Sequence, residues 1–379
     1  MSVAAAAAPA AADALASEAK ELVDLLARAP RPAGGAAERA ARDHCAARLA
    51  AAGFAVKEEP FAYSAFPGRY ATPIGGVLSA AALATAGHLG YRGVPGGALA
   101  ALGGALAVLA AGGLWMARRG VVDLPLARRR GVNLAARRGE PVVWLVAHLD
   151  SKSQPVPILA RAAGVIASAL CWIAALGVAV AQAGGANVAA LWPWIAGVGV
   201  LAGAPIAASV VGARSPGAVD NATGVAVVLL AAAAVPPTLP LGVLLPSAEE
   251  LGMAGARAWA RGRAPGVAVN CDGVDDSGML TLMYSGRRPE RLLAAGARAA
   301  ARANSPARAR RLLPGILTDG VALTDAGWEA VTVSRGTWDT LSRIHLPADR
   351  AERLTGRGVA DGARLVAAMA AALAGGEEG

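Results

Sequence analysis

The sequence predicts an α/β fold with a mostly parallel, mixed central sheet, helices on both faces of that sheet, and two inserted transmembrane helical hairpins. The first observation is composition: 55% of the 379 residues are hydrophobic and 17% are charged, whereas roughly 25% charged residues is usual in soluble domains. The second is a pair of long apolar blocks, 72–117 and 156–211. The third is an alternation of strand-like and helix-like segments elsewhere, which is typical of a parallel sheet.

The N-terminal segment predicts two helices and a strand. In residues 13–29 leucines recur at helical spacing among charged side chains, which indicates an amphipathic helix. Residues 36–52 predict a second helix that ends at Gly53, and 54–61 alternate like a strand. The segment lacks the basic stretch and compact apolar run of a secretory signal, so we expect that the protein is not exported.

Each apolar block is long enough for two membrane-crossing helices. Arg92 is the only charged residue of the first block and Arg161 the only one of the second. A crossing helix needs about 20 apolar residues. The alternative, Ala/Gly-rich helices buried in a large soluble domain, would need more covering protein than the remaining residues supply. We therefore expect one folded domain interrupted twice by a hairpin, with the boundaries 1–71, 72–117, 118–155, 156–211 and 212–379.

The sequence outside the N-terminal segment and the apolar blocks predicts an α/β core. Apolar runs of strand length alternate with helical segments, which predicts a sheet covered on both faces. The expected strands are 141–147, 241–246, 266–270, 279–284 and 330–334, and the expected helices are 223–232, 253–260, 289–303 and 358–373. Functional groups in such a sheet gather at the carboxyl ends of the strands.

Histidines and carboxylates follow these strands. His148 and Asp150 come after the first core strand, the adjacent Glu249 and Glu250 after the second, and Asp272 after the third. Imidazole and carboxylate without thiolate is a ligand set for zinc or a similar divalent ion, and one carboxylate can bridge two ions. Side-by-side carboxylates repel each other unless a cation neutralises one, which leaves the other as a proton shuttle.

Other residues carry weaker signals. His44 lies on a predicted helix and His88 at a membrane turn, where surface and interfacial roles are expected. The cysteines at 45, 171 and 271 lie far apart, which excludes a disulfide framework and a cysteine zinc site. The net charge of +9 comes with only 4% aromatic residues. Stacking platforms are therefore scarce, and we expect no nucleic-acid partner.

The ordered motifs resemble those of the co-catalytic zinc aminopeptidases of metallopeptidase family M-28. These motifs are His148-x-Asp150, Gly217-Ala-x-Asp220-Asn-Ala-x-Gly, Glu249-Glu250-x-Gly, Asn270-x-Asp272 and His345-x-Pro-x-Asp349. The resemblance also covers 31–35 and 131–136, and therefore most of the chain outside the apolar blocks. It implies a zinc-exopeptidase-like fold with two Zn²⁺ ions per chain, although cobalt or manganese could take their place.

The resemblance also implies a role for each matching residue. His148 and Asp272 would bind one zinc ion, Glu250 and His345 the other, and Asp220 would bridge them. Glu249 would be the general base and acid, and Asp150 would orient His148. The chain departs from the family at Ile344 and Leu346, where an aromatic residue and Thr are usual, and at Asp319-Gly320, where Ser-Asp precedes an aromatic residue or His. These departures bear on side-chain specificity and not on metal binding.

Arginines indicate how the hairpins are oriented. The hairpin ends are flanked by many arginines, whereas the two turns hold only Arg92. The flanking residues are Arg69, Arg118, Arg119, Arg128, Arg129, Arg130, Arg161 and Arg214. Because positive charge in short loops marks the cytoplasmic side, we expect an integral protein of the cytoplasmic membrane with its catalytic domain facing the cytoplasm.

These observations favour a membrane-embedded dizinc metallopeptidase, most simply an aminopeptidase acting on peptides. Its expected partners are a peptide substrate and the lipid bilayer, and the sequence leaves the oligomeric state open. Two alternatives remain open at this point. One is another activity of the same fold, such as a carboxypeptidase or an aminoacyl cyclase. The other is a non-catalytic membrane receptor or scaffold, although no expected ligand residue is missing from the chain.

Overall fold

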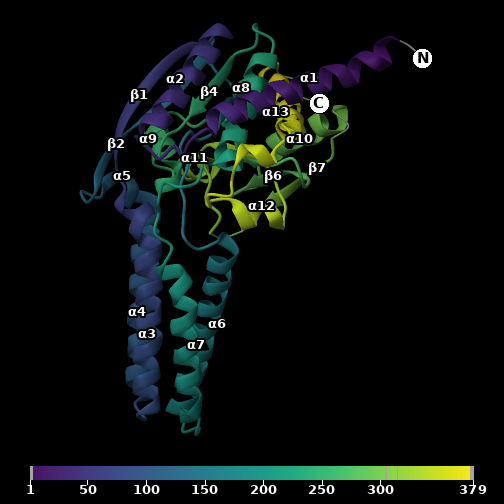
Figure 1. Ribbon diagram of the computed structural model, residues 1–379. Helices are drawn as coiled ribbons and strands as arrows, with labels where there is room; N and C mark the ends of the chain where they lie inside the picture. The colour runs from purple at the N-terminus through teal and green to yellow at the C-terminus, as the bar shows by residue number, and fades with distance from the viewer. Residues whose placement is uncertain (1–2, 304, 314, 376–379) are drawn as a thin grey trace. The chain divides into compact units, whose positions relative to one another are not determined.

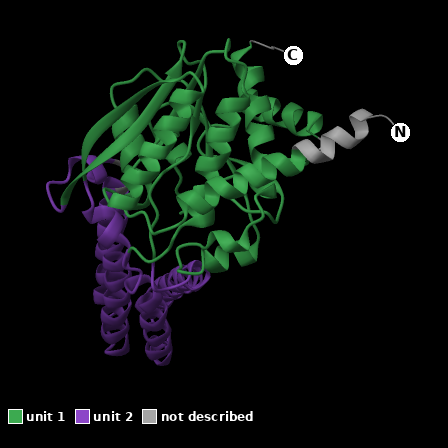
Figure 2. Ribbon diagram, turned by 45° about the horizontal axis from the view of Figure 1, so that its top comes forward, with its two compact units in different colours: residues 1–63, 128–153, 213–379 green, residues 64–127, 154–212 purple. Residues whose placement is uncertain are grey.

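The computed structural model describes residues 3–303, 305–313 and 315–375, with side chains described for 12–116 and 119–375 within these ranges. The chain forms two compact units (Figure 2). Unit 1 comprises residues 1–63, 128–153 and 213–379, and unit 2 comprises 64–127 and 154–212. The chain therefore leaves unit 1 twice and returns to it twice. Each unit is described separately below.

Unit 1 is built on one eight-stranded sheet with the order β1-β2-β4-β3-β5-β8-β6-β7. The four central strands run parallel, while β2 pairs antiparallel with β4 and β6 pairs antiparallel with β8. This is the predicted mostly parallel, mixed sheet. The strands are β1 (Ala55–Ser64), β2 (Arg128–Arg138), β3 (Trp144–Val146), β4 (Leu241–Leu245), β5 (Val267–Val274), β6 (Leu280–Tyr284), β7 (Ala307–Arg311) and β8 (Glu329–Arg335).

Helices cover both faces of this sheet, as expected (Figure 1). Successive side chains of a strand point to opposite faces, and the central strands are apolar on both. Leu145 and Val243 belong to the larger core with α1, α2, α8, α10 and α13, whereas Val146 and Leu244 pack with Trp259 of α9 and with α11. The helices are α1 (Val3–Leu26), α2 (Ala36–Ala51), α8 (Gly224–Ala234), α9 (Ala254–Ala260), α10 (Glu290–Arg302), α11 (Asp319–Asp325), α12 (Trp338–Arg343) and α13 (Arg357–Ala374).

Four strands differ from their prediction. β5 extends past its predicted end at residue 270 to Val274, so Asp272 lies on this strand and not after it. The expected strand 141–147 is paired as β3 only over Trp144–Val146, because Pro141 has no N–H to donate and Val142 is exposed. The strands β2 and β7 were not predicted, because both are rich in exposed arginine and therefore show no apolar alternation.

Unit 2 contains four long helices and the short α5 (Val121–Asp123). The long helices are α3 (Thr72–Tyr91), α4 (Pro95–Trp115), α6 (Ile158–Ala183) and α7 (Trp192–Ala207). Small residues let α3 and α7 approach closely: a Cβ at Gly76 would lie 2.6 Å from the backbone N of Ala207, and one at Gly203 would lie 2.9 Å from Ala80 Cβ. Such small-residue contacts are typical of helix packing within membranes.

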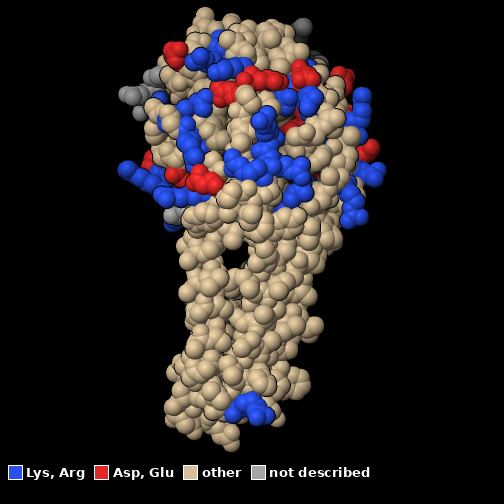
Figure 3. Space-filling view, turned by 90° about the vertical axis from the view of Figure 1, so that its left-hand side faces the viewer, with Lys and Arg blue, Asp and Glu red and all other residues tan. Residues whose placement is uncertain are grey.

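The outer surface of unit 2 is apolar. Large side chains such as Ile173, Leu201 and Trp194 are between 68% and 75% exposed, and the face of these helices in Figure 3 carries almost no charged side chain. Among the described residues, three helices are long and apolar enough to cross a membrane: Pro95–Trp115, Ile158–Ala183 and Ala189–Ala207. The remaining long helix, α3, includes Thr72, Ser79, Thr85 and His88, and is not in this group.

Candidate metal centre

His148 presents one free ring nitrogen to the centre of the site. It follows β3 and is 1% exposed. Its Nδ1 lies 3.0 Å from the backbone oxygen of Asp150. A carbonyl oxygen only accepts, so Nδ1 carries the proton and donates. The buried Nε2 has no hydrogen-bond partner among the described residues. This nitrogen is therefore oriented as a ligand for a cation.

Asp150 orients the site in a different way from the one the sequence suggests. Its carboxylate Oδ1 is 3.7 Å from His148 Nδ1, which is too long for a hydrogen bond. The carboxylate instead accepts hydrogen bonds from the backbone N–H groups of Glu249 and Glu250, at 3.0 and 3.2 Å. Asp150 therefore holds His148 through its backbone oxygen and the two glutamates through its side chain.

Asp220 lies between the two histidines. One of its oxygens is 3.2 Å from His148 Nε2, and the other is 2.7 Å from His345 Nε2. Burial on its own would raise the pKa of this carboxyl, but the contacts with His148 and His345 outweigh burial and hold the pKa well below its usual range. Asp220 is therefore ionised and shared, which is the arrangement expected of a bridging carboxylate.

The turn that carries Asp220 requires a glycine. Gly217 has a φ of 62°, in the left-handed region. A Cβ at this position would lie 2.4 Å from the backbone oxygen of Asp220 and 2.5 Å from Ser151 Cβ. The segment before α8 thus packs directly against the segment that carries His148. This close packing brings together residues that lie about 70 positions apart in sequence.

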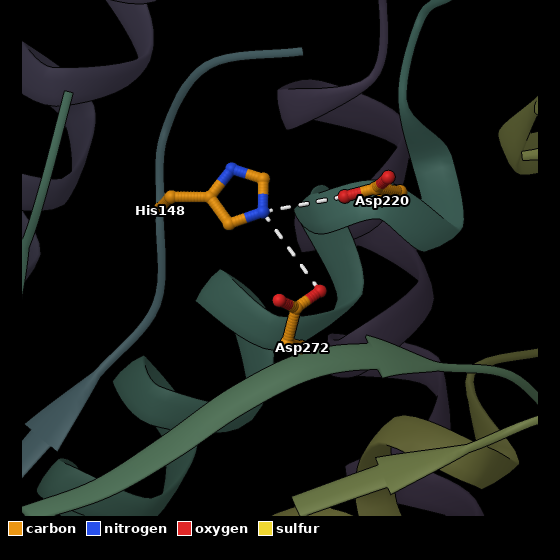
Figure 4. Close-up of side chains that lie close together, drawn as sticks. All are labelled: His148, Asp220 and Asp272. Carbon is orange, nitrogen blue, oxygen red and sulfur yellow. Dashed lines mark ion pairs between the residues drawn. The ribbon is translucent and has the colours of Figure 1, made fainter. Parts of the chain in front are cut away.

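Asp272 completes one group of potential ligands. It lies on β5, and its Oδ1 is 3.8 Å from His148 Nε2. Figure 4 shows His148 on the segment after a strand, with its ring pointing toward Asp220 and Asp272. Ligand atoms of His148, Asp220 and Asp272 all lie within 4.8 Å of one another.

Glu250 and His345 form the second group with the same Asp220. His345 Nε2 is 3.6 Å from Glu250 Oε1, and ligand atoms of these three residues also lie within 4.8 Å of one another. The other carboxylate oxygen of Glu250 is 2.6 Å from Lys152 Nζ. The pKa of Lys152 is raised, because Glu250, Glu249 and Asp220 outweigh the opposing effect of burial. Lys152 is therefore charged, and it contacts both oxygens of Glu250: its ammonium group contacts Oε2, and its backbone N–H donates to Oε1 at 3.2 Å.

Glu249 belongs to neither group. Its Oε2 is 3.9 Å from His148 Nε2, and its side chain is 7% exposed. Burial raises the pKa of this carboxyl well above its usual range; His148 lowers it, and the charges of Glu250, Asp319 and Asp272 raise it further. A buried carboxyl with a raised pKa beside a potential metal pair is suited to accepting and returning a proton.

The donor set fits two divalent cations. Each group supplies one imidazole nitrogen and two carboxylates, all hard or borderline ligands suited to zinc. Nε2 of His148, which has no hydrogen-bond partner among the described residues, and the carboxylate shared between two histidines both fit a cation placed between them. The structure thus brings all the sequence-predicted site residues into one region of unit 1: His148, Asp150, Asp220, Glu249, Glu250, Asp272 and His345.

Two further residues hold the site together without a predicted role. Arg31 is 2% exposed, and its guanidinium donates to the backbone oxygens of Leu149, Pro216 and Gly217 at 2.8, 2.7 and 3.0 Å. It therefore joins the segment that carries His148 to the one that carries Asp220. The second residue is Lys152, which pairs with Glu250. The sequence indicates a role for Lys152 only through its position two residues after the His148-x-Asp150 motif.

Comparison with known proteins agrees with this geometry. Residues 203–370 match the sequence model of peptidase family M28. No curated protein matches the chain by sequence. Two similar solved structures are an aminopeptidase from Aneurinibacillus sp. strain AM-1, with 16% identity, 95% of this chain and 93% of that chain covered and a TM-score of 0.54, and a zinc aminopeptidase from Bacillus subtilis, with 15% identity, 93% and 94% covered and a TM-score of 0.53.

A third similar structure has a different activity. Fimbriiglobus ruber glutaminyl cyclase shares 16% identity over 94% of this chain and 95% of its own, with a TM-score of 0.53. At such identities the likeness concerns the fold. The chain therefore has the mixed α/β fold of zinc aminopeptidases and glutaminyl cyclases, and its residues 203–370 match peptidase family M28.

Proposed function

We propose that this protein is a membrane-embedded dizinc aminopeptidase that hydrolyses the N-terminal residues of peptides. The observation that carries the proposal is Asp220, whose two oxygens face His148 and His345 at 3.2 and 2.7 Å. A carboxylate placed in this way joins two ligand groups into one binuclear site.

The proposed ligand roles follow from the two groups. His148, Asp272 and Asp220 would hold one zinc ion, and Glu250, His345 and Asp220 the other. A bound zinc pair supplies an activated water and polarises the scissile carbonyl. The ammonium group of Lys152 contacts the outer oxygen of Glu250, Oε2. The inner oxygen, Oε1, accepts a hydrogen bond from the backbone N–H of Lys152 at 3.2 Å and faces His345, and its remaining lone pair would bind the second ion.

Glu249 would carry the proton. Its backbone N–H is held by Asp150, which fixes the start of its side chain beside His148. The carboxylate would take a proton from the attacking water and return it to the leaving amine. This step requires a carboxyl group that does not ligate a metal, and Glu249 belongs to neither ligand group.

Unit 2 supports the membrane part of the proposal. Its outward face is apolar, and polar side chains inside the helix bundle bond to one another. Trp172 Nε1 donates to Ser79 Oγ at 2.8 Å, and Ser79 Oγ lies 2.9 Å from Ser168 Oγ. Interior polar groups with internal partners and large exposed apolar groups suit a lipid environment.

The arginine distribution extends this proposal to orientation. Residues 72–117 and 156–211 would form two transmembrane hairpins in the cytoplasmic membrane, with the peptidase domain, residues 1–71, 118–155 and 212–379, on the cytoplasmic side.

A second candidate is cyclisation of an N-terminal residue. The glutaminyl cyclase with a TM-score of 0.53 favours it, because the same fold there supports a different reaction. A carboxypeptidase has no such structural neighbour among those described above.

One experiment tests the function. Full-length protein purified in detergent would be analysed for metal content and assayed on aminoacyl fluorogenic substrates, a carboxyl-terminal substrate and an N-terminal glutaminyl peptide. We expect about two metal ions per chain and chelator-sensitive hydrolysis of the aminoacyl substrates. Cyclisation of the glutaminyl peptide without hydrolysis would support the second candidate, and metal-free inert protein would contradict both and favour a scaffold.

A further inference from the structure

One buried carboxylate near the two groups of potential ligands has no hydrogen-bond partner among the described residues. Asp319 begins α11 and is 0% exposed. Neither of its carboxylate oxygens makes a hydrogen bond with the described part of the chain, and Asp319 belongs to neither ligand group. A buried, unpaired carboxylate is unfavourable. A donor from outside the protein would satisfy these two oxygens.

Asp319 and the proposed general base, Glu249, influence each other's surroundings electrostatically. Burial raises the pKa of Asp319 to about 8; His148 lowers it, whereas Asp272 and Asp150 raise it further. The charge of Asp319 in turn raises the pKa of Glu249. Asp319 thus interacts with the same residues that surround the potential metal pair.

A second buried acceptor lies next to α11. Asn270 of β5 donates from Nδ2 to Thr332 Oγ1 at 3.3 Å, and its Oδ1 has no partner among the described residues. Thr318 Oγ1 lies 3.0 Å from the same Thr332 Oγ1. A Cβ at Gly320 would lie 2.5 Å from Thr332 Oγ1 and 3.7 Å from Asn270 Cβ. The backbone on both sides of Asp319 is therefore packed against the strands that carry Asn270 and Thr332.

We propose that Asp319, together with the Oδ1 atom of Asn270, binds the α-ammonium group of the substrate's N-terminal residue. An ammonium group has three N–H donors and no acceptor, which matches a site that offers only acceptors. Contact with the ammonium group would lower the pKa of Asp319 and favour the ionised carboxylate, and the resulting pair adds charge complementarity. An acylated amine or an internal peptide bond carries no charge and would leave the carboxylate unpaired. This inference rests on the proposed aminopeptidase function and deepens it.

Binding measurements test the proposal without requiring catalysis. The probes are L-leucinamide and 4-methylpentanamide, which has the same skeleton without the amine, titrated at pH 7 into full-length protein in detergent. We expect the wild-type protein to bind leucinamide about 10- to 100-fold more tightly, the range for a hydrogen bond to a charged group. Asp319→Asn should reduce this ratio to roughly 2- to 10-fold or less, the contribution of the remaining neutral acceptors, with an unchanged metal content.

Two further variants support the interpretation. Asp361→Asn changes a carboxylate on α13 that pairs with Arg335 and Arg364, and should leave the ratio unchanged. Asn270→Ala removes the second acceptor and should lower the ratio by roughly 2- to 10-fold, the range for a neutral hydrogen bond. This variant also tests the proposal if Asp319→Asn does not fold.

Three outcomes would overturn the proposal. They are equal binding of the two amides by the wild-type protein, an unchanged ratio in Asp319→Asn or in Asn270→Ala, and loss of metal from Asp319→Asn, which would make Asp319 a ligand. Hydrolysis is scored separately. A ratio that depends on Asp319, in a protein that hydrolyses no aminoacyl substrate, would support the ammonium site and contradict the aminopeptidase function.

Discussion

The carboxylate of Asp349 holds the backbone of Asp220. Its two oxygens accept hydrogen bonds from the N–H groups of Val219 and Asp220 at 2.9 and 3.1 Å. Asp349 is 1% exposed, and burial raises its pKa to about 7, although these two bonds oppose the rise. The last residue of the His-x-Pro-x-Asp motif therefore positions the proposed bridging ligand and belongs to neither group of potential ligands.

Removal of this contact should loosen the bridge. We expect Asp349→Ala to leave two buried N–H groups unpaired, at a cost of about 1–3 kcal/mol each, and to weaken metal binding. Thermal unfolding with and without added zinc measures both effects. The exposed Glu352→Gln is the matched control, and equal melting temperatures for the two variants would contradict the positioning role.

Glu249 should affect the reaction and not the metal. Glu249→Gln keeps the shape of the side chain but cannot accept a proton, so kcat should fall by roughly 10²–10⁴ while metal content stays near that of the wild-type protein. Metal analysis and steady-state kinetics on one aminoacyl substrate provide the test. Loss of a metal ion, or full activity, would show that Glu249 and Glu250 have exchanged roles or that the mechanism is wrong.

Asp220 and Asp150 should differ in their effects. Asp220→Ala removes the carboxylate shared by both groups and should abolish activity and disrupt binding of both ions. Asp150→Ala keeps the backbone oxygen that orients His148 but removes the acceptor for two glutamate N–H groups. It should weaken metal affinity about 10- to 100-fold. Similar mild effects in competitive chelator titrations of both variants would argue against a bridge.

Glu38 should make the stability of unit 1 depend on pH. This α2 residue accepts hydrogen bonds from Ser247 Oγ and the Gly34 N–H, at 2.5 and 2.6 Å. Burial, with the nearby charge of Asp150, raises its pKa to about 7 from 4.5. Between these values the folded state holds a proton that the unfolded state releases, so the contribution of Glu38 is fully present below pH 4.5 and is lost as the pH rises through 7.

The variant Glu38→Gln isolates this contribution. It should show a smaller loss of stability than the wild-type protein between pH 5 and 8, as measured by denaturant unfolding in detergent. If the stability of the two proteins depended on pH in the same way, Glu38 would not be the cause of the pH dependence.

Membrane topology can be tested by cysteine labelling. In a background without Cys45, Cys171 and Cys271, which are all buried, single cysteines at Arg92 and Ala186 should react with an impermeant maleimide in intact cells. A cysteine at Ser277, which is exposed on unit 1, should not. If the cysteine at position 277 reacted and those at positions 92 and 186 did not, the catalytic domain would face the outside of the cell. A protein that is soluble without detergent would mean that the hairpins are core helices.

The sequence by itself determined the α/β class, the two apolar insertions and the identity of the side chains that gather at the site. These properties depend on local periodicity and on the order of short motifs, which need no knowledge of distant contacts. The strands β2 and β7 escaped prediction for the same reason, because their arginine-rich segments are strands only through pairing with β4 and β6.

Only the tertiary structure decided how these residues act on one another. Contacts between segments far apart in sequence pair Lys152 with Glu250 and let Arg31 join the segments that carry His148 and Asp220. Among the described residues, the same packing leaves the buried Asp319 without a hydrogen-bond partner. Burial and partner distance set the pKa of a carboxyl and its freedom to bind, and both quantities arise when the chain folds. The motifs therefore name the candidate ligands, whereas packing determines which carboxylate shares its oxygens and which remains available to the proposed substrate.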